Sequence, residues 1–147
     1  MQALRIRPGQ LAERNLLEDL QRSASLALDD YREALLANPD AIALPAEQIE
    51  RGDVLVAEID GRLAGFAVIL DEAGKAELDG LFVEPGLWRN GIGLVLIEAA
   101  ATEARRRGLG PLTVIANPTA EEFYVKCGFV AKGTAHTRFG PGIRMSR

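Results

Sequence analysis

Residues 83–96 read Val-Glu-Pro-Gly-Leu-Trp-Arg-Asn-Gly-Ile-Gly-Leu-Val-Leu, and this stretch decides the fold. An apolar run at 81–83 meets a Pro-Gly break, and Gly91 and Gly93 then open a long segment of helical periodicity. The pattern predicts a strand, a turn and a helix. Glycines at a helix start let main-chain N–H groups approach a ligand, and the helix dipole there favours an anion, so the turn is suited to phosphate.

Two well-known phosphate-binding turns of this outline are excluded by the residues present. A P-loop requires Lys and then Ser or Thr after its last glycine, but Ile92 and Gly93 follow Gly91. A dinucleotide-binding fingerprint requires a third glycine three residues after Gly93, where Leu96 stands. A third kind of phosphate-binding turn, or a glycine turn with no ligand, remains.

The chain on both sides of the turn predicts alternating strands and helices. Asp60-Gly61 between two apolar runs is a strong hairpin signal. Before the turn we expect a strand at 3–7, helices at 10–22, 26–37 and 45–50, and strands at 54–59, 63–70 and 76–83. After it we expect a helix at 91–107, a strand at 112–116, a short helix at 117–126, and strands at 129–139 and 143–146 around Gly140-Pro141-Gly142.

This order predicts one α+β domain spanning residues 1–147. The strand, helix and strand around the turn form a right-handed crossover with a parallel pair, and the other neighbouring strands are expected to be antiparallel. The composition is that of a globular protein, with 26% charged and 48% hydrophobic residues. A length of 147 residues is sufficient for one hydrophobic core.

Charge and cysteine content exclude several classes of protein. The net charge of −4 argues against a nucleic-acid partner, which would require a basic surface. No apolar run reaches the roughly 18 residues that a membrane span needs, and the N-terminus lacks the apolar segment of a signal peptide, so we expect a cytoplasmic protein without membrane contact. One cysteine, Cys127, and one histidine, His136, cannot form a Cys/His metal site, and we expect no metal.

A second sequence block follows the predicted strand at 112–116. Residues 117–129 read Asn-Pro-Thr-Ala-Glu-Glu-Phe-Tyr-Val-Lys-Cys-Gly-Phe. This block is similar to the Asn-x-x-Ala-x-x-Phe-Tyr-x-x-x-Gly-Phe signature of the GNAT superfamily of acyl-CoA N-acetyltransferases. The turn at Gly91 and Gly93 resembles the coenzyme A turn of the same superfamily, Gln/Arg-x-x-Gly-x-Gly/Ala, with Trp88 at the Gln/Arg position. Two blocks at the expected spacing make the resemblance specific.

The resemblance implies the GNAT fold, a mixed and mostly antiparallel central sheet of six to seven strands with helices on both faces. It also implies acetyl-CoA as cosubstrate. In the superfamily the turn binds the pyrophosphate with main-chain amides, and the pantetheine arm lies between two strands that splay apart. The residues expected to contact the coenzyme are Leu81, Phe82, Val83, Arg89, Asn90, Gly91, Ile92, Gly93, Leu94, Asn117 and Tyr124.

The catalytic groups follow from the chemistry of the transfer. An acceptor amine attacks as the neutral base, although a free alkylamine has a pKa near ~10.4, so a carboxylate is needed to accept its proton. The resemblance implies that carboxylate at Glu77, with Asp79 as the neighbour that could replace it. Strict alternation along a strand predicts that both acids share a face with Leu81 and Val83. Tyr124 is implied as the acid that protonates the departing thiolate, and a main-chain N–H near Leu81 as the oxyanion donor.

The sequence thus predicts an N-acetyltransferase that moves an acetyl group to a primary amine by direct attack in a ternary complex. The alternative is a catalytically silent acyl-CoA-binding sensor, and a protein-interaction domain with a merely structural turn is a third hypothesis. The acceptor, a small molecule or an amine of a protein or peptide, is left open. So are the acyl chain length and a possible homodimer. We expect Arg105-Arg106-Arg107 to be a solvated helix end, Cys127 a buried residue and His136 a surface residue.

Overall fold

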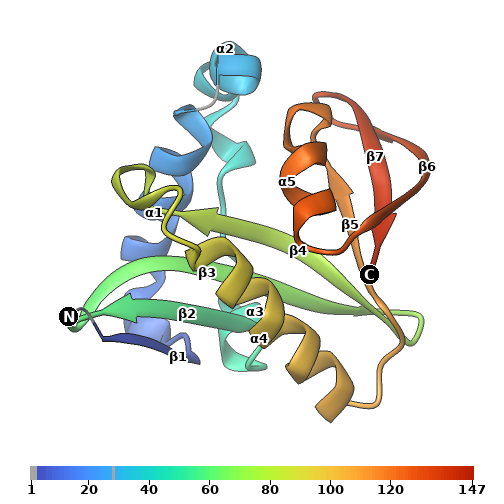
Figure 1. Ribbon diagram of the computed structural model, residues 1–147. Coiled ribbons are helices and arrows are strands. Elements are labelled where there is room, and N and C mark those ends of the chain that lie inside the picture. Colours follow the sequence, from blue (N-terminus) through green and yellow to red (C-terminus); the bar gives the residue numbers. More distant parts are fainter. Residues whose placement is uncertain (1–2, 28) are drawn as a thin grey trace.

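The computed structural model describes residues 3–27 and 29–147 and has one seven-stranded sheet of order β1-β2-β3-β4-β5-β7-β6 (Figure 1). Only the β4–β5 pair is parallel among these neighbours. The fold class expected from the sequence is therefore confirmed. The strands are β1 (Leu4–Pro8), β2 (Val54–Ile59), β3 (Arg62–Glu72), β4 (Lys75–Val83), β5 (Leu112–Ala116), β6 (Val130–Thr137) and β7 (Gly140–Ser146).

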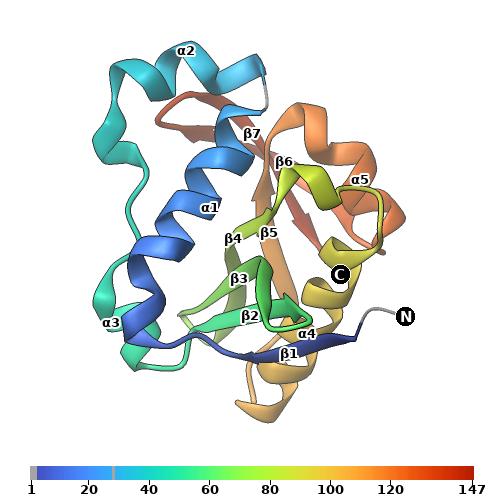
Figure 2. The ribbon, with the colours of Figure 1, turned by 90° about the vertical axis from the view of Figure 1, so that its left-hand side faces the viewer.

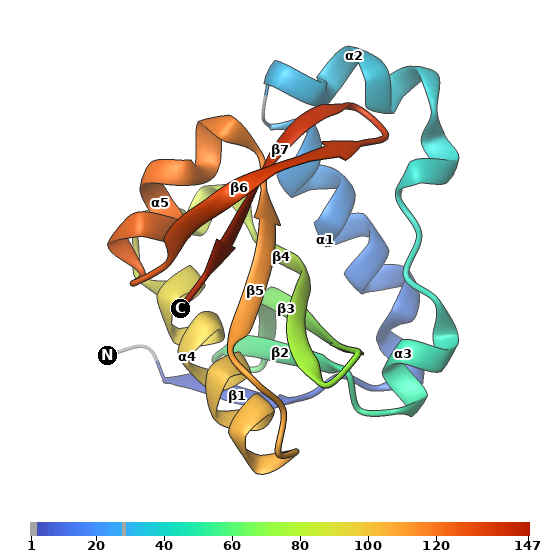
Figure 3. The same ribbon diagram turned by 90° about the vertical axis from the view of Figure 1, so that its right-hand side faces the viewer.

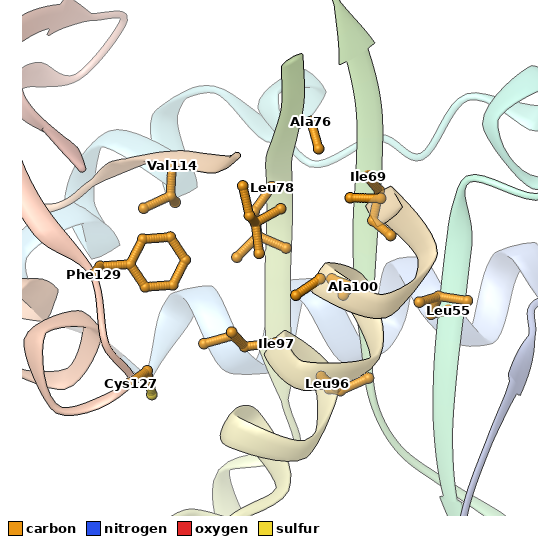
Figure 4. Packing of buried hydrophobic residues seen from close by; sticks show 14 of the residues in the cluster. Leu55, Ile69, Ala76, Leu78, Leu96, Ile97, Ala100, Val114, Cys127 and Phe129 are labelled. Carbon is orange, nitrogen blue, oxygen red and sulfur yellow. The ribbon is translucent and has the colours of Figure 1, made fainter. Parts of the chain in front are cut away.

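Helices cover both faces of the sheet, and each face has its own apolar cluster. On one face α1 (Arg14–Leu26) and α3 (Ala46–Glu50) pack against alternate residues of β2 and β3, among them Val56 and Phe66. On the other face α4 (Ile92–Arg106) packs Leu96, Ile97 and Ala100 against the remaining alternate residues (Figure 4). Figure 2 shows the sheet between α1 and α4. The other helices are α2 (Asp29–Ala37) and α5 (Glu121–Lys126).

Two tight hairpins connect the strands of the central meander. Asp60 and Gly61 have φ of 51° and 82°, and Ala73 and Gly74 have φ of 55° and 84°. Left-handed values at both loop positions are those of a type I′ turn, whose twist matches the flanking strands. The first hairpin lies where Asp-Gly predicted it. The second occupies only 73–74, because β3 and β4 continue further toward it than predicted.

A β-bulge at Asp79 interrupts the alternation of β4. The consecutive β3 residues Val68 and Ile69 pair with Gly80 and Leu78, so Asp79 is an extra residue on β4. A bulge of this kind reverses which face the following side chains point to.

The bulge corrects the expectation that the two acids share a face with Leu81 and Val83. Glu77 pairs with Leu70 on the face covered by α1 and α3, whereas Leu81 and Val83 pack with the cluster under α4. The prediction assumed that side chains alternate strictly between the two faces along β4. The extra residue at Asp79 breaks this alternation, and the sequence pattern does not reveal it.

The crossover from β4 through α4 to β5 gives a parallel pair that is only two residues long. Ala76 pairs with Leu112 and Glu77 with Thr113, and the strands then diverge (Figure 1). From Thr113 onward β5 pairs with β7 instead. The part of β4 beyond Glu77 consequently has no strand on its β5 side.

The C-terminal hairpin turns earlier than the sequence predicted. Gly140, Pro141 and Gly142 belong to β7, where they pair with β6, and the turn is Arg138-Phe139. A Cβ at position 142 would lie 2.7 Å from Ile115 Cγ2, so this glycine is needed for close packing and not for a turn. The hairpin tip reaches the segment after α2, where Arg138 is bonded to Asn38 and Asp40 (Figure 3).

The first helix also differs from its prediction. A 3-10 turn at Leu11–Glu13 precedes α1, and α1 continues to Leu26 instead of ending at 22. The periodicity of 10–22 predicts one apolar face made of Leu11, Leu16, Leu17 and Leu20. Leu17 and Leu20 are buried, but Leu11 and Leu16 are 50% and 58% exposed, so the buried face is narrower than predicted. The next helix was predicted at 26–37, but Leu26 belongs to α1 and α2 begins at Asp29; position 28 lies outside the described residues.

The C-terminal end of α4 is bonded to the segment just before β2 and is not simply a solvated helix end. Arg107 donates to Asp53 Oδ1 at 2.9 Å, to the Gly52 carbonyl at 2.8 Å and to Glu103 Oε1 at 3.0 Å. Asp53 is 6% exposed. Arg105, by contrast, donates to the Thr102 hydroxyl on the same helix, at 3.2 Å. In the part of the chain that the structure describes, no helix combines the length and apolarity that crossing a membrane requires.

Candidate functional site

The turn between β4 and α4 presents a row of free main-chain donors. Among the described residues, the N–H groups of Arg89 through Leu94 have no hydrogen-bond acceptor, and the first helical bond runs from the Val95 N–H to the Gly91 carbonyl at 3.1 Å. Free N–H groups at a helix start carry the positive end of the helix dipole. A row of this kind can bind an anion through its main-chain N–H groups.

The backbone of this turn is held in a left-handed conformation by local bonds. Arg89 and Gly91 have φ of 70° and 78°. The left-handed region costs a non-glycine residue of order 1 kcal/mol, and it persists at Arg89 because neighbouring groups fix the turn. Asn90 Nδ2 donates to the Leu87 carbonyl at 2.9 Å and to the Trp88 carbonyl at 3.3 Å. In a trans peptide the carbonyl of one residue and the N–H of the next point in opposite directions. Fixing the Leu87 and Trp88 carbonyls therefore also fixes the N–H groups of Trp88 and Arg89.

A cavity of about 460 Å³ joins this turn to the second sequence block. Its lining is mainly apolar and comes from five parts of the chain: the end of α1, the end of β4, the turn, the start of α4 and the segment from Thr119 to Tyr124. Gly93 and Phe123 are in close contact there, since a Cβ at Gly93 would lie 2.9 Å from Phe123 Cζ. The two blocks that carry the sequence resemblance thus form one site.

The open edge of β4 forms one wall of this cavity. The Glu84 N–H donates to the Ala64 carbonyl of β3 at 2.8 Å. Because residues of an antiparallel strand face alternate sides, Leu81 and Val83 direct their N–H and C=O groups away from β3. The Val83 carbonyl already accepts from Trp88 Nε1 at 2.8 Å. Leu81 therefore offers both of its main-chain groups to a ligand, and Val83 offers its N–H.

Asn117 supplies an unsatisfied polar group at the end of β5. Its Oδ1 accepts from the Thr119 N–H at 3.2 Å and so caps the short turn that precedes α5. Its Nδ2 is buried and has no partner among the described residues. A buried donor without an acceptor costs roughly 1–3 kcal/mol, so this amide is expected to have one when the site is in use.

Tyr124 lies on α5 and lines the same cavity. Its ring packs edge-to-face between Phe123 and Phe129, at centroid distances of 5.1 Å and 5.3 Å. Its hydroxyl bonds to no described residue. Burial, with a smaller effect of the neighbouring Cys127, raises the pKa of Tyr124 to about 12. The phenol is therefore protonated over the whole physiological range and can donate that proton.

Three carboxylates lie near the start of the split between β4 and β5. Burial raises the pKa of Glu77, and the negative charges of Asp79 and Glu72 add to the increase, while Arg144 opposes it. The pKa of Asp79 is raised by loss of hydration and by Glu72, although its side chain remains exposed at the surface. A carboxylate with a raised pKa is a better proton acceptor, and the two candidates for the base are thus chemically similar.

Cys127 and His136, which the sequence did not assign to the catalytic site, lie at positions that agree with that expectation. Cys127 ends α5, is 7% exposed, and has a thiol pKa raised by burial, which makes it unreactive. His136 is exposed on β6. Sequence reasoning missed Ala24 and Ser25, which line the cavity from α1, and the bond from Trp88 to Val83. Periodicity does not mark the long-range approach of α1 to the cavity, and the indole bond, although it spans only five residues, depends on the backbone conformation of the turn.

Comparisons with known proteins agree with this fold. PaiA N-acetyltransferase from Thermoplasma acidophilum, in complex with coenzyme A, is similar with a TM-score of 0.82 and 22% identity over 99% of this chain and 98% of that chain. An aminoglycoside 6′-N-acetyltransferase complexed with coenzyme A has a TM-score of 0.74 and 20% identity, over 97% of this chain and 96% of that chain. Nourseothricin acetyltransferase has a TM-score of 0.58 and 27% identity, over 63% of this chain and 62% of that chain.

These likenesses show a shared fold. No curated protein matches the sequence. Residues 16–129, which include the turn, the cavity and Tyr124, match the model of the acetyltransferase (GNAT) family. The chain belongs to the GNAT acetyltransferase family.

Proposed function

We propose that the protein transfers an acetyl group from acetyl-CoA to a primary amine, by direct attack of the amine within a ternary complex. The observation that supports this most is the continuity of the site. One cavity connects the free amides of 89–94 to Tyr124, and the open edge of β4 lies between them. A carrier with a pyrophosphate at one end and a thioester at the other matches both ends of this cavity.

Coenzyme binding is assigned to main-chain groups together with one side chain. The N–H groups of the turn hold the pyrophosphate, and Leu81 and Asn117 hold the amides of the pantetheine arm as an added strand would. The unsatisfied Asn117 Nδ2 gives this assignment independent support. Because main-chain groups hold the pyrophosphate, the turn can function with Trp88 at the position where the family pattern has Gln or Arg.

The transfer itself requires two proton movements. Glu77 or Asp79 accepts a proton from the amine, directly or through water, and the amine nitrogen forms a bond to the thioester carbon. The Leu81 N–H donates to the resulting oxyanion. As the carbon–sulfur bond breaks, Tyr124 gives its proton to the thiolate. The products are an N-acetyl amine and the free thiol.

The pKa of Tyr124 is compatible with this step. Transfer from a phenol of pKa about 12 to a thiolate of pKa near ~8.5 is uphill by roughly 3.5 pKa units, or about 5 kcal/mol. A turnover of about 10 s⁻¹ implies a total barrier near ~16 kcal/mol. The proton transfer fits within that barrier.

Calorimetry with coenzyme A, followed by thiol release from acetyl-CoA over a panel of amines, tests the proposal. The panel comprises polyamines, aminoglycosides, lysine and peptides with free N-termini. Binding together with amine-dependent thiol release is the expected result. Binding without release for every amine would favour the acyl-CoA sensor, and absence of binding would favour the interaction domain.

A further inference from the structure

The side chain of Trp88 joins the coenzyme turn to the strand that precedes it. Its Nε1–H donates to the Val83 carbonyl at 2.8 Å, so it fastens the last residue of β4 to the residue just before the left-handed Arg89. The indole is 40% exposed and lines the cavity. The indole has one hydrogen-bond donor, which bonds to the main chain, and a side chain this exposed contributes little to the hydrophobic core. We therefore look for its role in the shape of the turn.

The bond acts on both parts of the proposed coenzyme site. The open edge begins at Leu81 and ends at Val83, and the free amides begin at Arg89. Between them lies the segment from Glu84 to Leu87, whose Glu84 N–H donates to the Ala64 carbonyl of β3. Trp88 supplies a second connection, so the separation between the strand edge and the amides is set by its indole.

We propose that Trp88 is a positioning residue for the coenzyme, which presets the distance between the pantetheine edge of β4 and the pyrophosphate amides. This inference rests on the proposed function. Trp88 acts through Val83 and the turn, and the chemistry at Tyr124 does not involve it. A second consequence is that the Val83 carbonyl is withheld from the pantetheine arm, which leaves the Leu81 carbonyl as the acceptor and the Val83 N–H as the donor that this edge of β4 offers to the arm.

The substitution Trp88→Phe keeps an aromatic ring and removes the donor. A neutral hydrogen bond of ordinary strength corresponds to about a fivefold change in an equilibrium constant, so we expect the Kd for coenzyme A and the KM for acetyl-CoA to rise about fivefold. The kcat at saturating acetyl-CoA and the melting temperature should be unchanged, because the indole takes no part in the proposed proton transfers and is 40% exposed. Val125→Ala, an exposed position on α5, is the matched control.

The wild-type protein provides a direct signal, because Trp88 is the only tryptophan in the chain. Its fluorescence emission should change on titration with coenzyme A, with the same Kd as calorimetry gives. If wild type binds and Trp88→Phe binds equally well or more tightly, the positioning role is wrong while the proposed function stands. A lower melting temperature with an unchanged Kd would show a structural role only. No binding by wild type would contradict the proposed function itself.

Discussion

The substitution Tyr124→Phe removes one oxygen atom and leaves the aromatic packing in place. The ring lies edge-to-face against Phe123 and Phe129 at interplanar angles of 74° and 80°, and phenylalanine can keep both contacts. The hydroxyl bonds to no described residue, so its loss breaks no bond in the fold. We therefore expect an unchanged Kd for acetyl-CoA and a melting temperature within about 2 °C of wild type.

The effect on rate follows from the acids that remain. Water, with a pKa of about 15.7, would replace a phenol of pKa about 12, a difference of roughly 3.7 pKa units. With the proton about half transferred in the transition state, this difference lowers the rate by about a hundredfold. Because the folded pKa of the phenol is raised, wild type should keep this acid protonated up to about pH 11, and its loss of rate should begin only above that value.

Single-turnover thiol release, measured with saturating acetyl-CoA and the best amine of the panel, isolates this step. Phe123→Leu is the control, because it disturbs the packing of Tyr124 without removing its acid. A rate for Tyr124→Phe within about threefold of wild type would refute the assignment of Tyr124 as the acid. A large increase in Kd would instead make the hydroxyl a binding group.

Three further predictions test the turn, the base and the fold. Gly91→Val places a β-branched residue at φ 78°, and the Kd for coenzyme A should rise more than tenfold, whereas Gly110→Ala, whose Cβ has room, should not change it. The rate should fall as pH drops through the raised pKa of the base, and one of Glu77→Gln and Asp79→Asn should abolish this acid limb; if neither does, the base lies elsewhere. Arg107→Met removes the bonds to Asp53, Glu103 and the Gly52 carbonyl and leaves the buried Asp53 paired, among the described residues, with Arg51 alone. It should cost about 2 kcal/mol of unfolding free energy by urea denaturation, against less than ~0.5 for Arg105→Met.

The sequence predicted the elements of the fold well because its local signals are strong. Asp60-Gly61 located a hairpin, and Gly91 marked the start of α4, since both require backbone conformations that few residues adopt. The parallel pair of β4 and β5 followed from the rules of connection, and the mixed, mostly antiparallel sheet from the family resemblance. The expected apolar face of the first helix was less accurate, because periodicity alone does not show how wide a surface the sheet covers.

The geometry of the site was less predictable. The bulge at Asp79 separates Glu77 from the face of Leu81, and it depends on pairing with β3 that a sequence pattern does not encode. The bond from Trp88 to Val83 depends on how the turn folds back on its own strand. The bulge thus arises from a tertiary contact, and the indole bond from the backbone conformation of the turn, and periodicity reveals neither.

The central claim is that the free amides of 89–94 and the open edge of β4 hold one coenzyme molecule. Backbone amide NMR during a titration with coenzyme A tests it most directly. We predict the largest shifts at Gly91, Ile92 and Gly93, with shifts at Leu81 and the side-chain amide of Asn117 that saturate at the same concentration. Saturation without shifts at the turn, or no shifts at millimolar coenzyme A, would contradict it.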